Sequence, residues 1–329
     1  MAKTALYVCL FAASLAAQPN QTVDSKTQSE VVGNLCDRLE HNYVYPETAA
    51  KMSADLKRRL AAGDYEKVTA PADFAARLTT DLQAISHDKH LRVRYSQAPV
   101  PVHNREGRPS AEERERVRAQ MARNNFGFEK VERLQGNIGY LDLRGFMDAQ
   151  WGSDTAVAAM NFLANTDALI IDLRQNGGGD PAMVALITSY LFAPGEEVHL
   201  NDLYWRPSNE THQWWTLPYV PGRRYANKPV YVLTSNRTFS AAEEFTYNLK
   251  NLKRATIIGE TTGGGAHPGG MERLSEHFMA FLPSGRAINP ISKTNWEGAG
   301  VTPDVAVPAA DALSTATAAA LRKIAEPGG

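Results

Sequence analysis

Residues 168–179 have the sequence Ala168-Leu169-Ile170-Ile171-Asp172-Leu173-Arg174-Gln175-Asn176-Gly177-Gly178-Gly179. The first six form an apolar run interrupted by one aspartate, which is typical of a strand buried in a parallel sheet. Three glycines follow, and a helix is predicted to begin near Pro181. Glycine lets a backbone turn tightly and expose N–H groups, which at the start of a helix can bind a phosphate or an oxyanion. The spacing does not match a dinucleotide fingerprint, and no phosphate-loop lysine is present.

The same alternation of strand and helix recurs on both sides of this stretch. Continuous apolar runs predict strands, and segments with helical spacing predict helices. In chain order the predicted elements are strand 137–143, helix 155–165, strand 168–173, helix 181–192, strand 229–234, helix 241–252 and strand 255–258. Such a βαβ succession indicates an α/β domain, which we assign to residues 126–329.

The residues before this domain have a helical pattern instead. Helices are predicted at 25–41, at 47–62 (with Pro46 in the first turn and Gly63 as C-cap) and at 71–85, followed by a short strand at 91–95. We therefore expect a small N-terminal helical domain over residues 18–96. Residues 97–125 contain prolines and a dense run of charges, which predicts a linker and an exposed helix.

The first 17 residues have the pattern of a secretory signal peptide. Lys3 is followed by an apolar run that ends in small residues, which suits cleavage near Ala16 or Ala17. The run is too short to span a bilayer, and a polar segment follows it, which disfavours the alternative of a buried helix. No later stretch is apolar enough to be transmembrane. The mature protein is therefore expected to be secreted or periplasmic, without an integral membrane segment.

Composition excludes several other classes of protein. The 329 residues include 35 basic and 36 acidic side chains, so no basic field is available to hold a nucleic acid. Two cysteines cannot build a disulfide scaffold, and no cluster of cysteine and histidine has the spacing of a zinc site. We expect no nucleic-acid partner, no metal and no organic cofactor.

An aromatic-rich segment occupies residues 202–225 of the α/β region. Its rings are Tyr204, Trp205, Trp214, Trp215, Tyr219 and Tyr225. The favoured interpretation is a loop that packs its rings on the domain as a flap. The alternative is a lid or an apolar wall of a substrate groove.

A candidate nucleophile lies in the next connection from strand to helix, residues 234–245. Glu243 follows Ser240 by three residues, which is the spacing of a helix capping box, and the segment alone favours that structural role. The functional alternative makes Ser240 a nucleophile at a helix start. The N–H group of Ala241 would then be directed at the developing oxyanion.

Three further motifs make the pattern more specific: Asp88-Lys89-His90-Leu91, the glycine-rich turn 259–268 and the loop 297–305. Together with residues 172–179 and the Ser240 segment, they resemble the serine peptidase superfamily of C-terminal processing proteases, the tricorn protease core and interphotoreceptor retinoid-binding protein. The resemblance covers roughly residues 28–310. It implies a crotonase-like (ClpP/crotonase-type) α/β catalytic domain, preceded here by the small helical domain.

The resemblance also distinguishes between two kinds of general base. In C-terminal processing proteases the base is a lysine 25 residues beyond the serine, a position that Gly265 occupies here. The chain lacks a PDZ domain and looks closer to the retinoid-binding-protein and tricorn branch, whose base is a histidine matching His90. Glu297 matches the supporting glutamate of that branch. The tricorn core has a bridging serine where this chain has Lys89, so water or another hydroxyl would connect His90 to Glu297.

These residue types suit acyl transfer. A serine hydroxyl needs a base to become a nucleophile, and an imidazole can take that proton and return it to the leaving amine. The backbone N–H groups of Gly178 and Ala241 would hold the oxyanion, as the resemblance implies. His267, beside the glycine turn, is the rival base, and the motif favours His90.

The sequence thus predicts an exported serine peptidase that cleaves peptide or protein substrates through an acyl-enzyme. Its cleft should lie between the two domains. One alternative is a protein that binds apolar or lipid-like ligands, which the aromatic segment would suit. Another is an esterase or acyl-transfer enzyme that uses the same serine. The presence of Ser240, His90 and Glu297 together favours the enzyme, because a binding protein needs none of them.

Overall fold

The computed structural model describes residues 22–100 and 110–326, so the predicted signal peptide lies outside the described part of the chain. At the centre is a six-stranded sheet with the strand order β12-β8-β7-β4-β3-β2. Its strands are β2 (Phe128–Leu134), β3 (Ile138–Leu143), β4 (Ala168–Asp172), β7 (Val230–Thr234), β8 (Thr256–Gly259) and β12 (Val305–Ala306). β2 is antiparallel to β3, whereas the other neighbouring pairs are parallel.

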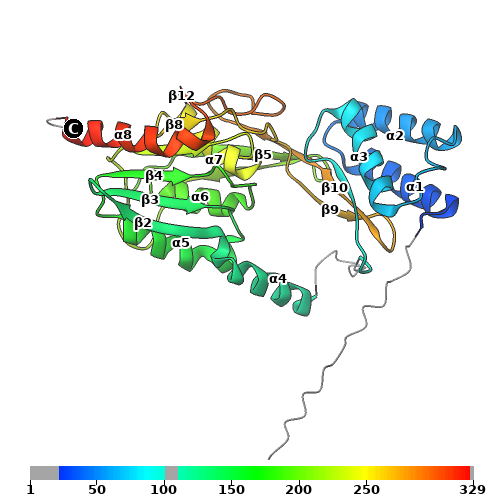
Figure 1. Ribbon diagram of the computed structural model, residues 1–329, viewed down its shortest axis with the longest axis horizontal. Helices are drawn as coiled ribbons and strands as arrows, with labels where there is room; N and C mark the ends of the chain where they lie inside the picture. The colour runs from blue at the N-terminus through cyan, green and yellow to red at the C-terminus, as the bar shows by residue number, and fades with distance from the viewer. Residues whose placement is uncertain (1–21, 101–109, 327–329) are drawn as a thin grey trace, which may run out of the picture.

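Helices cover both faces of this sheet (Figure 1). One face packs against α5 (Ala149–Leu163), α6 (Pro181–Ser189) and α7 (Ala241–Asn251), and the other against α8 (Ala312–Ala325). In β4, Leu169 and Ile171 enter the first of these cores, whereas Ile170 enters the second. Burial on both faces explains the uninterrupted apolar run of this strand and confirms the α/β fold that the sequence predicts.

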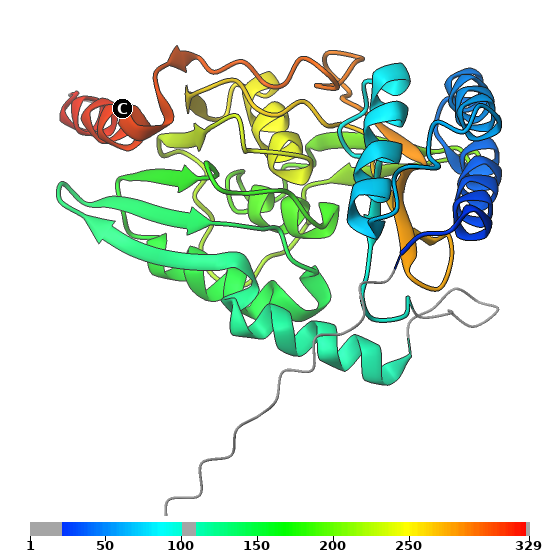
Figure 2. The same cartoon turned by 45° about the vertical axis from the view of Figure 1, so that its right-hand side comes forward.

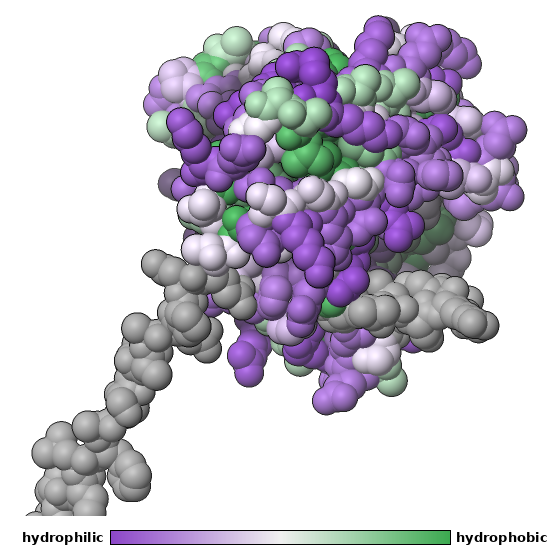
Figure 3. Space-filling model, turned by 90° about the vertical axis from the view of Figure 1, so that its right-hand side faces the viewer, coloured by the Kyte–Doolittle hydropathy of each residue, from purple (hydrophilic) through white to green (hydrophobic). Residues whose placement is uncertain are grey.

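The N-terminal helices lie at one end of the molecule (Figures 1 and 2). They are α1 (Ser25–Asn42), α2 (Pro46–Ala61) and α3 (Pro71–Ser86), each within one or two residues of its predicted start and end. Pro46 and Pro71 lie in the first turns of α2 and α3, where a backbone N–H group has no acceptor within the helix, so proline is tolerated there. These prolines made the starts of both helices predictable from the sequence. Seen from this end, the surface is mainly hydrophilic with a small apolar area near its middle (Figure 3).

A hairpin from the second half of the chain completes the N-terminal core. β9 (Gly269–Arg273) and β10 (Phe278–Pro283) form a three-stranded sheet with β1 (Arg92–Tyr95), in the order β1-β10-β9. Phe278 is buried against Phe74 of α3, with ring centroids 5.8 Å apart. The helical region and the α/β region therefore share strands, and the turn after α3 is held close to the glycine-rich loop that precedes β9.

The aromatic segment differs from the predicted loop. Most of it belongs to a hairpin of β5 (His199–Trp205) and β6 (Glu210–Trp215), which pairs through β5 with β11 (Gly285–Ile288). Trp205 and Trp214 pack against a small core that includes Leu203 and Trp296. Aromatic residues favour strands, and β5 and β6 pair with each other across a short turn, whereas the pairing of β5 with β11 joins segments far apart in the chain.

The charged segment forms α4 (Ala111–Arg123), an exposed helix with no buried residue, as predicted. The Glu113 carboxylate accepts the Ser110 N–H group and the Ser110 hydroxyl accepts the Glu113 N–H group, so a capping box begins this helix. The short helix η1 (Asn125–Gly127) follows, and η2 (Ala309–Asp311) precedes α8. Within residues 22–100 and 110–326, no helix is both long enough and apolar enough to cross a membrane.

Candidate active site

Ser240 is held in a strained backbone conformation immediately before α7. Its φ is +56° and its ψ is −123°, a region that residues with a Cβ atom rarely adopt. The Ser240 N–H group donates to Glu243 Oε2 over 2.9 Å, so Glu243 has the capping role that its spacing predicts. Strain of this kind costs about 1–3 kcal/mol and is found mainly at functional sites, including the sharp turns that expose nucleophilic serines.

Glu243 also fixes the glycine-rich loop beside the serine. Its fully buried carboxylate accepts the N–H groups of Gly264 and Gly265, at 2.6 and 2.8 Å, and the hydroxyl of Thr262. A Cβ atom at position 265 would overlap the Phe239 ring and lie 2.7 Å from His90 Cε1. A side chain at position 265 would therefore have to displace the rings of Phe239 and His90.

The two predicted oxyanion donors lie next to Ser240 but differ in availability. A Cβ atom on Gly178 would lie 2.7 Å from Ser240 Cβ and 2.9 Å from the Ala241 nitrogen, so only glycine fits there. The Gly178 N–H group, however, already donates to Asn176 Oδ1 over 2.9 Å. The Ala241 N–H group belongs to the first turn of α7, where N–H groups have no acceptor within the helix.

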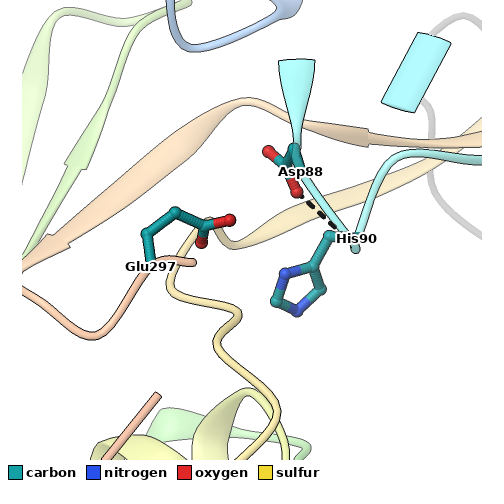
Figure 4. A group of neighbouring side chains, drawn as sticks. All are labelled: Asp88, His90 and Glu297. Atoms are coloured by element: carbon teal, nitrogen blue, oxygen red, sulfur yellow. Dashed lines mark hydrogen bonds between the residues drawn. The ribbon is translucent and has the colours of Figure 1, made fainter. Parts of the chain in front are cut away.

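His90 projects from the turn that follows α3. Asp88 Oδ1 accepts the His90 N–H group over 2.9 Å and holds this turn (Figure 4). The imidazole lies between two phenylalanines, with ring centroids 4.5 Å from Phe239 and 5.6 Å from Phe281. Burial lowers the pKa of His90 to about 4, so the ring is neutral at pH 7 and can accept a proton.

His267 occupies a different place in the same neighbourhood. Its Nδ1 atom lies 2.8 Å from Asp88 Oδ2 and 3.5 Å from Glu297 Oε2, and its Nε2 atom lies 3.5 Å from the Tyr45 hydroxyl. Both ring nitrogens thus have partners. The side chain is buried, and it does not line either cavity that reaches Ser240.

Glu297 faces Asp88 and His90 from the loop before β12 (Figure 4). Its Oε2 atom accepts the Ala266 N–H group over 2.5 Å, and burial raises the pKa of Glu297 to about 7. Glu297 Oε1 and His90 Nδ1 are both buried without a hydrogen-bond partner among the described residues.

Asp88, His90 and Glu297 each bring a potential metal-ligand atom to within 4.8 Å of the others. The Asp88 carboxylate is already committed. Its Oδ1 accepts from the His90 N–H group, and its Oδ2 accepts from His267 and from the Tyr43 hydroxyl over 3.2 Å. Asp88 therefore already has hydrogen-bond donors at both carboxylate oxygens, whereas Glu297 Oε1 and His90 Nδ1 have no partner among the described residues.

Two cavities meet at Ser240. The first, of about 360 Å³, is lined by Ser240 and His90 together with Gly179, so it lies between the α/β region and the N-terminal region. The second, of about 160 Å³, is lined by Ser240, Ala241 and Glu244. A larger cavity of about 900 Å³ lies at the starts of β7 and β8 and contains neither Ser240 nor His90 among its lining residues.

Family models match two adjoining parts of the chain. Residues 137–307 match the model described as Peptidase family S41, and residues 22–126 match the N-terminal domain of Peptidase_S41 in eukaryotic IRBP. The chain belongs to peptidase family S41. These matches confirm the predicted resemblance and the assignment to this family of serine peptidases. Ser240 and Glu297 lie within the S41 match, and His90 lies within the N-terminal match.

Individual relatives agree with this assignment. A carboxy-terminal-processing protease of Bartonella bacilliformis is 29% identical over 179 residues, which are 53% of this chain and 40% of the relative. The S41 chain described here thus spans less than half the length of that curated relative.

Solved structures share the fold. A putative peptidase from Parabacteroides merdae superposes with a TM-score of 0.61 at 18% identity, covering 92% of this chain and 98% of the other. The tricorn protease superposes with a TM-score of 0.58 at 14% identity, covering 91% of this chain and 37% of the other.

Sequence reasoning missed two contributors to this site. The sequence predicts no role for Asp88 within the motif Asp88-Lys89-His90-Leu91, although in the structure this residue connects His90 to His267. Glu244 was not singled out, because two acidic residues in the first turn of a helix are ordinary. A sequence signal existed for Asp88, since an aspartate two residues before a histidine often accepts a backbone N–H group in a turn.

Proposed function

We propose that this S41 peptidase is an exported enzyme that cleaves peptide bonds through an acyl-enzyme formed on Ser240. His90 acts as the general base and Glu297 as the supporting carboxylate. The observation that carries the proposal is that a strained serine and a neutral, buried imidazole line the same cavity. Export is proposed from the pattern of residues 1–17.

The proposed reaction begins with transfer of the Ser240 hydroxyl proton to His90 as the oxygen attacks the carbonyl carbon of the substrate. The carbonyl oxygen becomes an oxyanion, which the Ala241 N–H group stabilises. His90 then gives its proton to the leaving amine, and the acyl-enzyme forms. Water attacks the ester in the second half, again with His90 as base, and releases the new carboxyl end.

The second oxyanion donor is proposed to be Gly178, as the sequence predicts. Its N–H group becomes available when the hydrogen bond to Asn176 Oδ1 opens. Gly179 lines both cavities at Ser240 and is the neighbouring alternative. Loss of one such donor typically costs about 3 kcal/mol of transition-state stabilisation.

Glu297 is proposed to act on His90 through a bridging water molecule. Glu297 Oε1 and His90 Nδ1 are both buried, and both lack a hydrogen-bond partner among the described residues. The two residues and Asp88 each have one potential ligand atom within 4.8 Å of those of the other two. A single water molecule can bridge two polar atoms at this distance, and such a bridge is nearly as favourable in enthalpy as a direct hydrogen bond. The carboxylate would stabilise the imidazolium that forms when His90 takes the serine proton.

The test is a digest of an unbiased peptide mixture by the mature protein, read by mass spectrometry. Ser240→Ala should abolish cleavage without changing the melting temperature by more than a few degrees. Ser208→Ala, in the exposed turn between β5 and β6, is the matched control and should cleave normally. Undiminished cleavage by Ser240→Ala would refute the proposal that Ser240 is the nucleophile. Hydrolysis of esters but not of peptides would replace it with the esterase alternative.

A further inference from the structure

The two cavities at Ser240 share Gly179, Pro268 and Gly269, but only one of them is lined by the proposed base. The cavity that contains His90 must receive the leaving amine, because His90 gives its proton to that group. The cavity that contains Ala241 has no histidine among its lining residues and adjoins the proposed oxyanion donor. It is therefore placed to receive the residue that contributes the attacked carbonyl group.

Glu244 is the one acidic residue within residues 22–100 and 110–326 that lines this second cavity. It lies four residues after Ser240, one turn along α7, so the two residues share a face of the helix. Its side chain is 4% exposed, and its Oε1 atom has no hydrogen-bond partner among the described residues. The amide of Asn201 lies beside it and is also buried without a well-aligned partner in the described part of the chain.

The remaining walls of this cavity are mainly apolar and carry no basic side chain. They come from β5, the glycine-rich loop and the segment around β11, and include Leu203, Trp205, Ala266, Pro268, Ala287 and Trp296. The volume of about 160 Å³ suits a single side chain, since a cavity of about 150 Å³ holds a benzene-sized molecule. Burying a carboxyl group among apolar side chains costs free energy of folding unless a hydrogen-bond donor or a cation contacts it.

We propose that this cavity binds the side chain of a lysine or arginine residue whose carbonyl group Ser240 attacks, with Glu244 as the partner of its cationic end. The aliphatic part of such a side chain would lie against Trp205 and Trp296, and the charged end would reach Glu244. The inference rests on the proposed function of Ser240 and extends it by naming the substrate class.

The protonation of Glu244 is consistent with this pairing. Burial raises the pKa of Glu244 to about 8 against the lowering effect of the Asn201 amide, and the charge of Asp180 adds a smaller upward contribution, so the group is largely neutral at pH 7 before substrate binds. A cation within 4–6 Å favours the charged form of a carboxyl group and would restore its negative charge. A neutral acid in the free protein avoids the larger cost of an unpaired buried charge.

The first test compares substrates that differ at one position. Short peptide amides with lysine, arginine, norleucine or glutamine before the cleaved bond are assayed for kcat/KM. We expect lysine and arginine to exceed norleucine by at least tenfold. Glu244→Gln should lower the ratio of kcat/KM for the lysine peptide to kcat/KM for the norleucine peptide by about tenfold or more. Removing one partner of a buried charge pair leaves the other charge buried and unpaired, which weakens binding. Asp202→Asn, an acid on β5 outside the cavity, should leave the ratio unchanged.

The second test separates failure of this inference from failure of the proposed function. Peptides with lysine or norleucine at the same position are titrated into Ser240→Ala protein, with binding followed by calorimetry. The inference predicts that the lysine peptide binds at least tenfold more tightly than the norleucine peptide. Adding Glu244→Gln should abolish this difference. These results would support the inference whether or not the unmodified protein cleaves peptides. Equal binding of both peptides, or a preference for norleucine or glutamine, would overturn it.

Discussion

At the scale of single residues, the site depends on the unusual states of three side chains. Ser240 is strained, His90 is neutral and Glu297 has a raised pKa. Burial is the largest cause of both pKa shifts, and it acts in opposite directions because it penalises the charged form of each group. A base with a pKa near 4 is weak in the free protein. The proposed mechanism requires the proton affinity of His90 to rise during the reaction, which a negative Glu297 would provide.

The pH dependence of kcat/KM tests this relation. Below a pH of about 7 Glu297 gains a proton and loses its stabilising charge, so activity should fall as pH decreases through that value. His90 stays neutral until the pH approaches about 4. In Glu297→Gln, activity should be lower throughout, and the acid limb should move below pH 5. An acid limb near the ordinary histidine value of 6.5 in both proteins would contradict these assignments.

At the scale of elements, the loops between strands and helices determine the geometry of the site. The turn after α3 carries His90, the connection from β7 to α7 carries Ser240, and the glycine-rich loop after β8 packs against both. Glu243 binds that loop to α7 through its buried carboxylate. The close approach of the loop to His90 leaves no space for a side chain at position 265.

Substitution of Gly265 tests the importance of this close approach. Gly265→Ala would place a methyl group against Phe239 and 2.7 Å from His90 Cε1, so the imidazole must shift from its position. We expect kcat/KM to fall by at least tenfold, because a misplacement of about 1 Å can cost about 10²-fold in rate. Gly270→Ala in β9 is the control, since nothing lies within 4 Å of its new methyl group. Equal activity of both variants would contradict the packing argument.

Elements with local signals were predictable from the sequence, and elements defined by distant pairing were not. The prolines that begin α2, α3 and α6 and the apolar runs of β4 and β7 identified those elements within a few residues. The strands β2, β5, β6, β9, β10 and β11 were not predicted. The β1–β10 and β5–β11 pairs join segments far apart in the chain, so no local pattern shows them, whereas β2, β6 and β9 pair only within local hairpins. α5 begins six residues before its predicted start, at a cap provided by Asp148.

The same distinction between local signals and distant contacts applies to the candidate active site. Ser240, His90 and Glu297 could be proposed from motifs, and the structure brings all three into one neighbourhood. The occupied N–H group of Gly178 and the position of Glu244 in a cavity were not predictable, because both depend on contacts between separate loops.

At the scale of the whole molecule, the β9–β10 hairpin connects the N-terminal helices to the α/β core. Its buried residues pack with α1, α2 and α3, while its ends continue into the glycine-rich loop and into β11. The hairpin also carries Phe281, which contacts the His90 ring. His90 of the N-terminal region therefore keeps its position relative to Ser240 of the α/β region because both regions share this hairpin.

Loss of packing in the hairpin should therefore affect stability and activity together. Phe278→Ala removes a nearly fully buried ring that contacts Phe74, and such substitutions typically cost about 3–5 kcal/mol of unfolding free energy. We expect a lower melting temperature and a lower kcat/KM at temperatures where the protein remains folded. Met271→Ala, at an exposed position of β9, should change neither quantity appreciably. A destabilised Phe278→Ala protein with full activity would show that the hairpin does not position His90.

The central claim is that His90 activates Ser240, and covalent labelling tests it most directly. A fluorophosphonate probe is incubated with the protein, and the modified residue and its rate of modification are determined by mass spectrometry. We predict modification of Ser240, slowed by about 10²-fold or more in His90→Ala and by less than tenfold in His267→Ala, as expected for loss of a general base. Modification of another residue, or a larger effect of His267→Ala than of His90→Ala, would contradict the claim.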